Sequence, residues 1–157
     1  MCIVIDINTL VPVFNEKSSL HVEFIPLRAW LSKRHGFVVF GGTTYINELK
    51  KTYRHLRLFR QMKDSGMAIS VMDDLVDAQE SVVKKKTHGT DCDDPHIIAL
   101  LGVSRCPLLC SHDARSFKYI RDKSLYPKGA PKVKIYTCKK NQKLLKPMKA
   151  AMIKNQA

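Results

Sequence analysis

The sequence predicts an α/β fold, a three-layer α/β/α sandwich whose central, mostly parallel sheet has five strands. The first observation behind this prediction is that short apolar segments, rich in β-branched residues, alternate along the chain with longer amphipathic segments. The second is that the short segments are apolar almost throughout, which is typical of parallel strands covered by helices on both faces. The length of 157 residues suits a single domain.

The strand candidates are each bounded by Gly, Pro, Asp or Lys, which are common at strand ends and turns. In chain order they are CIVID (2–6), FVVFG (37–41), MAISVM (67–72), PLLCS (107–111) and VKIYT (133–137).

The segments between these strands carry apolar residues at helical spacing and are predicted to be crossover helices. In the segment 43–64, for example, such residues recur every three or four positions at Ile46, Leu49, Tyr53, Leu56 and Phe59. In chain order the predicted helices cover 18–34 with a break near Pro26, 43–64, 74–87, 94–105 and 114–123.

We expect the folded domain to span residues 1–137 and residues 138–157 to form a basic tail, helical or partly disordered. After Asp122 the chain contains ten lysines and no acidic residue. Such a segment could hold a nucleic-acid backbone without reading its sequence, or it could be a solvated tail. A second basic stretch, RHLRLFRQMK, is more typical of a solvated helix face, with cations at Arg54, Arg57, Arg60 and Lys63.

The chain carries 27 Lys and Arg against 14 Asp and Glu, a formal net charge of +13. A strongly positive field favours polyanionic partners, either nucleic acid or an anionic membrane surface, although the charge can also serve solubility alone. No apolar run approaches the roughly 18–20 residues of a membrane span, and the N-terminus lacks the basic segment of a signal peptide. The five cysteines include no C-x-x-C pair, which favours reduced thiols. We therefore expect a cytoplasmic protein with no membrane partner.

Four acidic residues from separate segments are expected to meet at one edge of the sheet. Asp6 directly follows the first strand, and in open parallel sheets the ligand crevice lies beyond the carboxyl ends of the strands. Glu48 lies in the helix after the second strand, Asp94 opens the helix of DDPHIIALLG, and Asp113 follows the fourth strand. Carboxylates gathered in one cleft repel each other unless a cation compensates them, and Mg²⁺ and Mn²⁺ prefer oxygen ligands. The four acids are therefore candidate ligands of Mg²⁺ or Mn²⁺.

Two of these assignments have alternatives. Asp6 taken alone could equally cap the helix that follows it. Asp91 and Asp93 compete with Asp94 for the third position. We prefer Asp94 because its register places an apolar helix face behind it, whereas Asp93 could be the N-cap residue of that helix.

Four short motifs occur in order between residue 2 and about residue 120, each in a fitting strand or helix context. They are IVIDINTL, with Asn8 two residues after Asp6; NEL, with Glu48; DDPHIIALLG, with Asp94; and LLCSHD, with Ser111 two residues before Asp113. Together these motifs resemble the PIN-domain nuclease family. The resemblance implies a three-layer α/β/α fold and Mg²⁺- or Mn²⁺-dependent hydrolysis of phosphodiester bonds, usually in RNA, at an acidic site formed by the four acids.

The resemblance also bears on partners and on the number of metal ions. Some family members are toxins held inactive by a small antitoxin protein, and homodimers are common, so both are candidate partners beside nucleic acid. Family members often carry a further acid shortly after the position of Asp113, where this chain has Ala114, Arg115 and Ser116. This departure favours one tightly held ion over two.

Two rival functions can be weighed on the same residues. A phosphatase of the haloacid dehalogenase type also has an Asp after its first strand, but it needs a second Asp where this chain has Asn8. The other rival is a PIN-like fold without activity that binds nucleic acid or another protein. Four intact acids argue against it, because a binding module gains nothing from like-charge repulsion in a cleft. Asn8 and Ser111 could fix a carboxylate or contact a phosphate oxygen, or they could simply shape turns.

Overall fold

The structure is a computed structural model, and it describes residues 1–147. Its centre is a five-stranded sheet in which all paired neighbours run parallel. The predicted α/β class and the five predicted strands are confirmed. The strands are β1 (Cys2–Ile5), β2 (Phe37–Gly41), β3 (Ala68–Val71), β4 (Leu108–Cys110) and β5 (Lys134–Tyr136), in the sheet order β3-β2-β1-β4-β5.

Helices connect the strands along the chain. The α-helices are α1 (Leu10–Phe14), α2 (Ile25–Ser32), α3 (Thr43–Lys50), α4 (Tyr53–Asp64), α5 (Asp73–Lys86), α6 (Pro95–Ser104) and α7 (Phe117–Ile120). Short 3-10 helices are η1 (Ile7–Thr9), η2 (His21–Phe24), η3 (Ala114–Ser116), η4 (Lys123–Leu125) and η5 (Lys139–Leu144).

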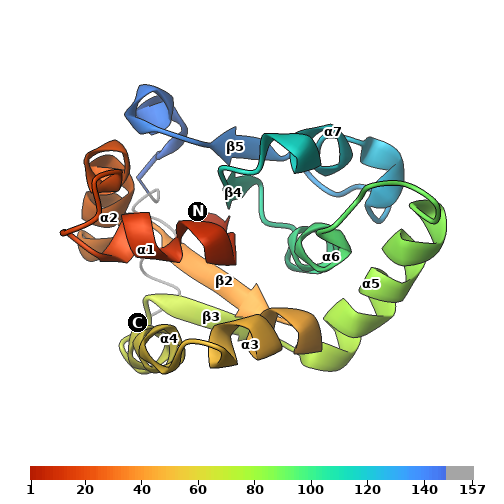
Figure 1. The fold of residues 1–157 in the computed structure, drawn as a ribbon, viewed down its shortest axis with the longest axis horizontal. Coiled ribbons are helices and arrows are strands. Elements are labelled where there is room, and N and C mark those ends of the chain that lie inside the picture. Colours follow the sequence, from red (N-terminus) through yellow and green to blue (C-terminus); the bar gives the residue numbers. More distant parts are fainter. Residues whose placement is uncertain (148–157) are drawn as a thin grey trace.

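The order of the strands explains the three layers. The chain first moves from β1 through β2 to the edge strand β3, and it then crosses back to β4 and β5. Because crossovers between parallel strands are right-handed, the two directions place their helices on opposite faces of the sheet. Accordingly, α1, α2 and α4 lie on one side and α5, α6 and α7 on the other (Figure 1). The reversal sets β1 beside β4, and at such a switch point a ligand crevice opens beyond the carboxyl ends of the strands.

Several helices differ from the prediction. The segment 43–64 forms two helices, because Thr52 is extended (φ −126°, ψ 100°) and separates α3 from α4. The five-residue α1 was not predicted, since LVPVF is too short to show a helical period. Only one α-helical turn, α7, forms within 114–123. The break predicted near Pro26 is confirmed, because the 3-10 helix η2 ends at Phe24 and α2 begins at Ile25. Pro26 lies in the first turn of α2, where its missing N–H group breaks no helical hydrogen bond.

Helix α6 is buried on all sides. Its residues from Pro95 to Gly102 are buried, because the helix lies between the sheet and α5. The sequence prediction placed a single apolar face behind Asp94, so this expectation was too narrow. A helix that is apolar all round belongs in the core, and the one titratable side chain among these buried residues is His96.

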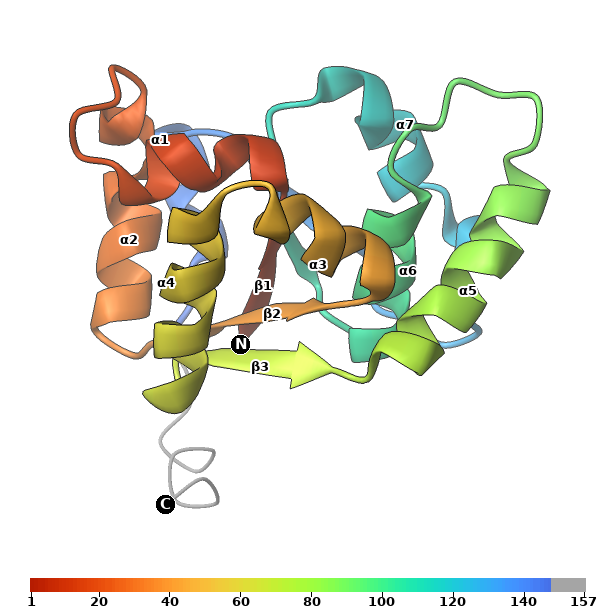
Figure 2. The same cartoon turned by 60° about the horizontal axis from the view of Figure 1, so that its bottom comes forward.

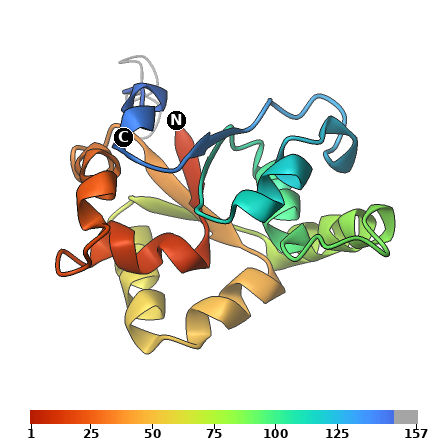
Figure 3. The same ribbon diagram turned by 45° about the horizontal axis from the view of Figure 1, so that its top comes forward.

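The segment after β5 returns to the layer that contains α2 (Figure 3). Here η5 contacts α2, and the indole N–H of Trp30 donates a hydrogen bond of 2.9 Å to the carbonyl oxygen of Lys146. The predicted basic tail therefore contacts the domain through η5 and Lys146, and the segment 148–157 lies outside the described residues. Among residues 1–147 no helix is long and apolar enough to cross a bilayer.

Candidate acidic site

The carboxylate of Asp6 lies where β1 and β4 end side by side. Asp6 is 5% exposed, and its Oδ2 accepts a hydrogen bond of 2.9 Å from the hydroxyl of Ser111. Its Oδ1 lies 3.4 Å from the backbone N of Asn8, and its backbone carbonyl accepts a 2.7 Å hydrogen bond from the hydroxyl of Thr9. Asp6 therefore caps the turn after β1 with one oxygen while the other is held at the switch point.

Asp113 extends the site from the end of β4. The hydroxyl of Ser111 accepts the backbone N–H of Asp113 at 3.2 Å, so one hydroxyl links Asp6 to the turn that carries Asp113. The Asp113 Oδ1 accepts the backbone N–H of Arg115 at 3.2 Å and lies 3.6 Å from its Nε atom. The Arg115 side chain is 76% exposed, so it places a solvated positive charge at the rim of the site.

Glu48 reaches the site from α3, and Tyr45 ties this helix to the end of β1. The buried Tyr45 hydroxyl donates a 2.6 Å hydrogen bond to the backbone carbonyl of Ile5. Glu48 lies three residues after Tyr45 and therefore on the same helix face. Its Oε2 lies 3.4 Å from Nε2 of His96, which is 4% exposed. The sequence analysis missed His96, although a lone polar residue inside the apolar run PHIIALLG was a usable signal.

Acids of α5 hold α3 in position. Asp73 Oδ1 accepts the backbone N–H of Gly42 at 2.9 Å, and Asp77 Oδ1 accepts that of Thr43 at 2.8 Å. These bonds satisfy N–H groups at the start of α3 that have no partner within the helix. Gly42 has a φ of +89°, and a Cβ atom there would lie 2.6 Å from Cγ1 of Val76. The close approach of α5 therefore requires glycine at position 42. The two hydrogen bonds from α5 support α3, the helix that carries Glu48.

Of the three competing aspartates, Asp94 lies near enough to the other predicted acids for their charges to raise its pKa. Asp93 is exposed and lies 3.5 Å from the guanidinium of Arg115, while Asp91 is exposed and pairs with Lys118 at 3.1 Å. Asp94 is half-buried at the N-cap position of α6, the position that the sequence analysis had considered for Asp93. Its carboxylate makes no capping hydrogen bond to the first turn of α6, which the structure describes in full.

The pKa values of two acids show that the carboxylates share one electrostatic environment. Burial raises the pKa of Asp6, and the hydrogen bond from Ser111 partly opposes this rise. Burial also raises the pKa of Asp94 to about 6. The negative charges of Asp6, Asp113 and Glu48 add to the rise at Asp94. The charges of three predicted acids therefore reach Asp94, and that of Glu48 also reaches Asp6, although the four acids come from four segments.

The donor chemistry of the site suits a hard divalent cation, because carboxylate oxygens are the ligands that Mg²⁺ and Mn²⁺ prefer. The spacing is more open than that of a closed metal centre. Within residues 1–147, no group of three or more His, Cys, Asp or Glu side chains lies close enough together to hold one ion as the side chains stand. A scan against protein-family models, a search of curated proteins and a search of solved structures each returned no match to this chain.

Proposed function

We propose that this protein is a metal-dependent endonuclease of the PIN-domain type, which hydrolyses phosphodiester bonds in RNA in preference to DNA. The proposal is carried by four acids that approach one another beyond the ends of β1 and β4. At Asp94, burial is the main cause of a pKa raised to about 6, and the charges of Asp6, Asp113 and Glu48 add to the rise. Keeping these carboxylates together lowers stability unless a cation compensates them. The net charge of +13 supports a polyanionic substrate.

The roles of the acids follow from the segments that carry them. Asp6 and Asp113 would hold the ion from the ends of β1 and β4. The Ser111 hydroxyl fixes the Asp6 carboxylate and accepts the backbone N–H of Asp113, so it positions the turn that carries the second acid. Asp94 and Glu48 would complete the site from α6 and α3. When bound, Mg²⁺ or Mn²⁺ would supply the Lewis acid that activates water and stabilises charge at the phosphate.

Two further residues support these roles. His96 contacts the Glu48 carboxylate from the buried side and restricts where it can lie. Arg115 carries an exposed charge next to Asp113, where it can contact a phosphate oxygen of the substrate. The five cysteines are free thiols, which supports a reducing location such as the cytoplasm.

The open spacing of the acids favours one alternative, a catalytically inactive PIN-like module that binds nucleic acid or another protein. Such a module would bind RNA without cutting it under either metal. The family resemblance admits an inhibitory antitoxin protein or a second copy of the chain as a partner in both cases.

The test is cleavage of end-labelled single-stranded RNA and DNA of one sequence, with Mn²⁺, with Mg²⁺ and with a chelator. Asp6→Asn and Asp113→Asn remove predicted ligands, while Asp93→Asn removes a nearby exposed carboxylate as a matched control. We expect metal-dependent products that only the first two substitutions abolish, with folding and RNA binding retained by all variants. A native protein that binds RNA but never cuts it, or an Asp6→Asn variant that cuts equally well, would show that the acidic site is not catalytic.

A further inference from the structure

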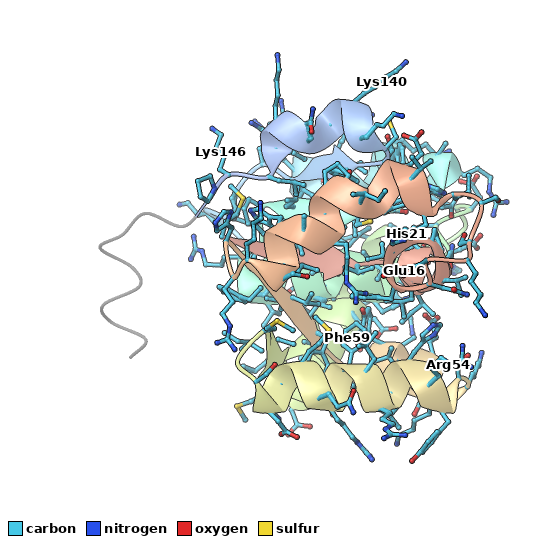
Figure 4. All side chains as sticks on the ribbon, turned by 90° about the vertical axis from the view of Figure 1, so that its left-hand side faces the viewer. Glu16, His21, Arg54, Phe59, Lys140 and Lys146 are labelled. Atoms are coloured by element: carbon cyan, nitrogen blue, oxygen red, sulfur yellow. The ribbon has the colours of Figure 1, made fainter. Side chains whose placement is uncertain are left out.

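A cleft of about 660 Å³ lies between α1 and α4. The ribbon of Figure 2 shows these two helices next to each other on the same face of the sheet, and Figure 4 shows that region with its side chains. Its lining combines apolar residues with cations, among them Val11, Phe14, Leu58, Lys17, Arg54 and Arg57. Glu16 is the one acid in the lining, and it lies at the same end of the cleft as Arg54 in Figure 4.

Cations outnumber acids in the cleft, whose lining has Glu16 as its one acid beside Lys17, Arg28, Arg54 and Arg57. Within the described part of the chain, Lys17, Arg54 and Arg57 form no ion pair with a carboxylate. His55 also lines the cleft, and its pKa is lowered by burial and by the positive charge of Arg54. Uncompensated positive charge favours an anionic occupant. A second copy of this chain would bring a further +13 and is therefore disfavoured.

The apolar part of the lining favours single-stranded nucleic acid over a nucleic-acid duplex as the occupant of the cleft. A duplex presents mainly its phosphates, so it would leave apolar side chains such as Val11 and Leu58 uncovered. In a single strand the bases can pack on these side chains while the phosphates contact the cations. The guanidinium of Arg28 lies 5.2 Å from the ring centre of Phe14, and both residues line the cleft. Planar cations and aromatic rings are surfaces on which unpaired bases stack.

Both walls of the cleft are continuous with segments that carry the acids. Helix α1 begins four residues after Asp6, a distance of about 8 Å at the ~2 Å rise per residue of a 3-10 helix. Helix α4 begins at Tyr53, five residues after Glu48. Short stretches of chain thus join the acidic site to both walls of the cleft, η1 on one side and residues 49–52 on the other.

We propose that the cleft between α1 and α4 binds the single-stranded nucleic acid adjoining the phosphodiester bond at the acidic site. The position of that bond rests on the proposed function, whereas binding in the cleft does not.

Helix α4 supplies a matched pair of variants for the test. Arg54→Gln/Arg57→Gln removes two exposed cations that line the cleft, and Arg60→Gln/Lys63→Gln removes two exposed cations of the same helix that do not. Binding of a fluorescent single strand and of the matching duplex is measured in chelator over a range of salt concentrations, so that no cleavage occurs. Equal thermal unfolding midpoints confirm that both variants are folded.

For single-stranded nucleic acid, each phosphate contact contributes ~0.7 to the steepness of the fall of log affinity with log salt. The cleft variant lacks two such contacts, so its slope should be shallower than that of the native protein by about 1.4. If the two proteins bind equally at about 1 M salt, this difference in slope makes the cleft variant bind about 25-fold more weakly than the native protein at ~0.1 M salt. The control variant should bind within about threefold of the native protein, and the cleft variant should lose less affinity for the duplex than for the strand.

The inference is overturned if both variants lose affinity equally, since the attraction would then be diffuse. It is also overturned if the cleft variant binds the strand normally, which would leave an acidic protein segment as the occupant that the charge favours. A native protein that binds through the cleft but never cuts would remove the proposed function and leave the cleft inference standing. If the cleft variant instead cuts RNA with metal as well as the native protein does, the cleft inference falls and the proposed function stands.

Discussion

Replacing Asp94 by Asn should stabilise the metal-free protein, because it removes a charge that the fold disfavours. Burial and the neighbouring acids raise the pKa of Asp94 from 3.8 to about 6. A carboxyl group with a raised pKa binds its proton more tightly in the folded than in the unfolded chain. The free energy of unfolding therefore falls as the pH rises from about 4 to about 6, and the ionised carboxylate costs stability at every higher pH.

The size of the effect follows from the same shift. A rise of about 2 pKa units corresponds to about 3 kcal/mol, at ~1.36 kcal/mol per unit. Asp94 is only half-buried, so solvent screens part of the repulsion, and we expect about 1–2 kcal/mol at pH 7.5. Asn is as favourable as Asp at an N-cap position, so α6 should not be weakened.

Urea unfolding in chelator, followed by circular dichroism, measures this difference at pH 7.5 and at pH 4. The gain from Asp94→Asn should largely disappear at pH 4, where the native carboxyl group is protonated. Asp93→Asn is the control and should change stability by less than ~0.5 kcal/mol at either pH, because Asp93 is exposed. The reasoning is refuted if Asp94→Asn destabilises the protein at pH 7.5, or if its effect is the same at both pH values.

Three further substitutions test other parts of the structure. Gly36→Ala places a Cβ atom 1.8 Å from the buried Trp30 ring, and we expect a loss of about 2 kcal/mol in urea unfolding; no loss would mean that the ring can move aside. Tyr45→Phe removes the buried 2.6 Å hydrogen bond to the end of β1, so the midpoint of urea unfolding should fall by the equivalent of about 1–2 kcal/mol, and a neutral result would contradict this role for the hydroxyl. Ser111→Ala removes a hydrogen bond that lowers the pKa of Asp6, so an NMR titration of that carboxyl group should give a higher pKa than in the native protein, and an unchanged value would speak against this contact.

The fold could be predicted well from the sequence, because each strand is a local run of apolar residues and each crossover has a local period. The order of the strands depends on pairings between distant segments and was not predicted. The interruption at Thr52 was missed because the apolar period continues through it at Leu49, Tyr53 and Leu56. Local patterns therefore identified the elements but did not fix how they meet.

The same distinction applies to the acidic site. Asp6, Asp94 and Asp113 could be proposed because each lies at the end of a strand or the start of a helix, positions that a local pattern shows. The contacts of Glu48 with His96 and of Asp6 with Ser111 join residues far apart in the chain. They depend on α6 packing against the sheet and on β1 lying beside β4, which only the folded structure reveals.

The central claim is that the four acids form a divalent cation site, and direct titration with Mn²⁺ tests it. Free Mn²⁺ is followed by electron paramagnetic resonance at pH 7.5 for the native protein, Asp6→Asn, Asp94→Asn and Asp93→Asn. We expect the native protein and Asp93→Asn to bind Mn²⁺ alike, and each of the other two variants to bind it at least about tenfold more weakly. Equal binding by all four proteins, or no binding by the native protein at millimolar Mn²⁺, would contradict the claim.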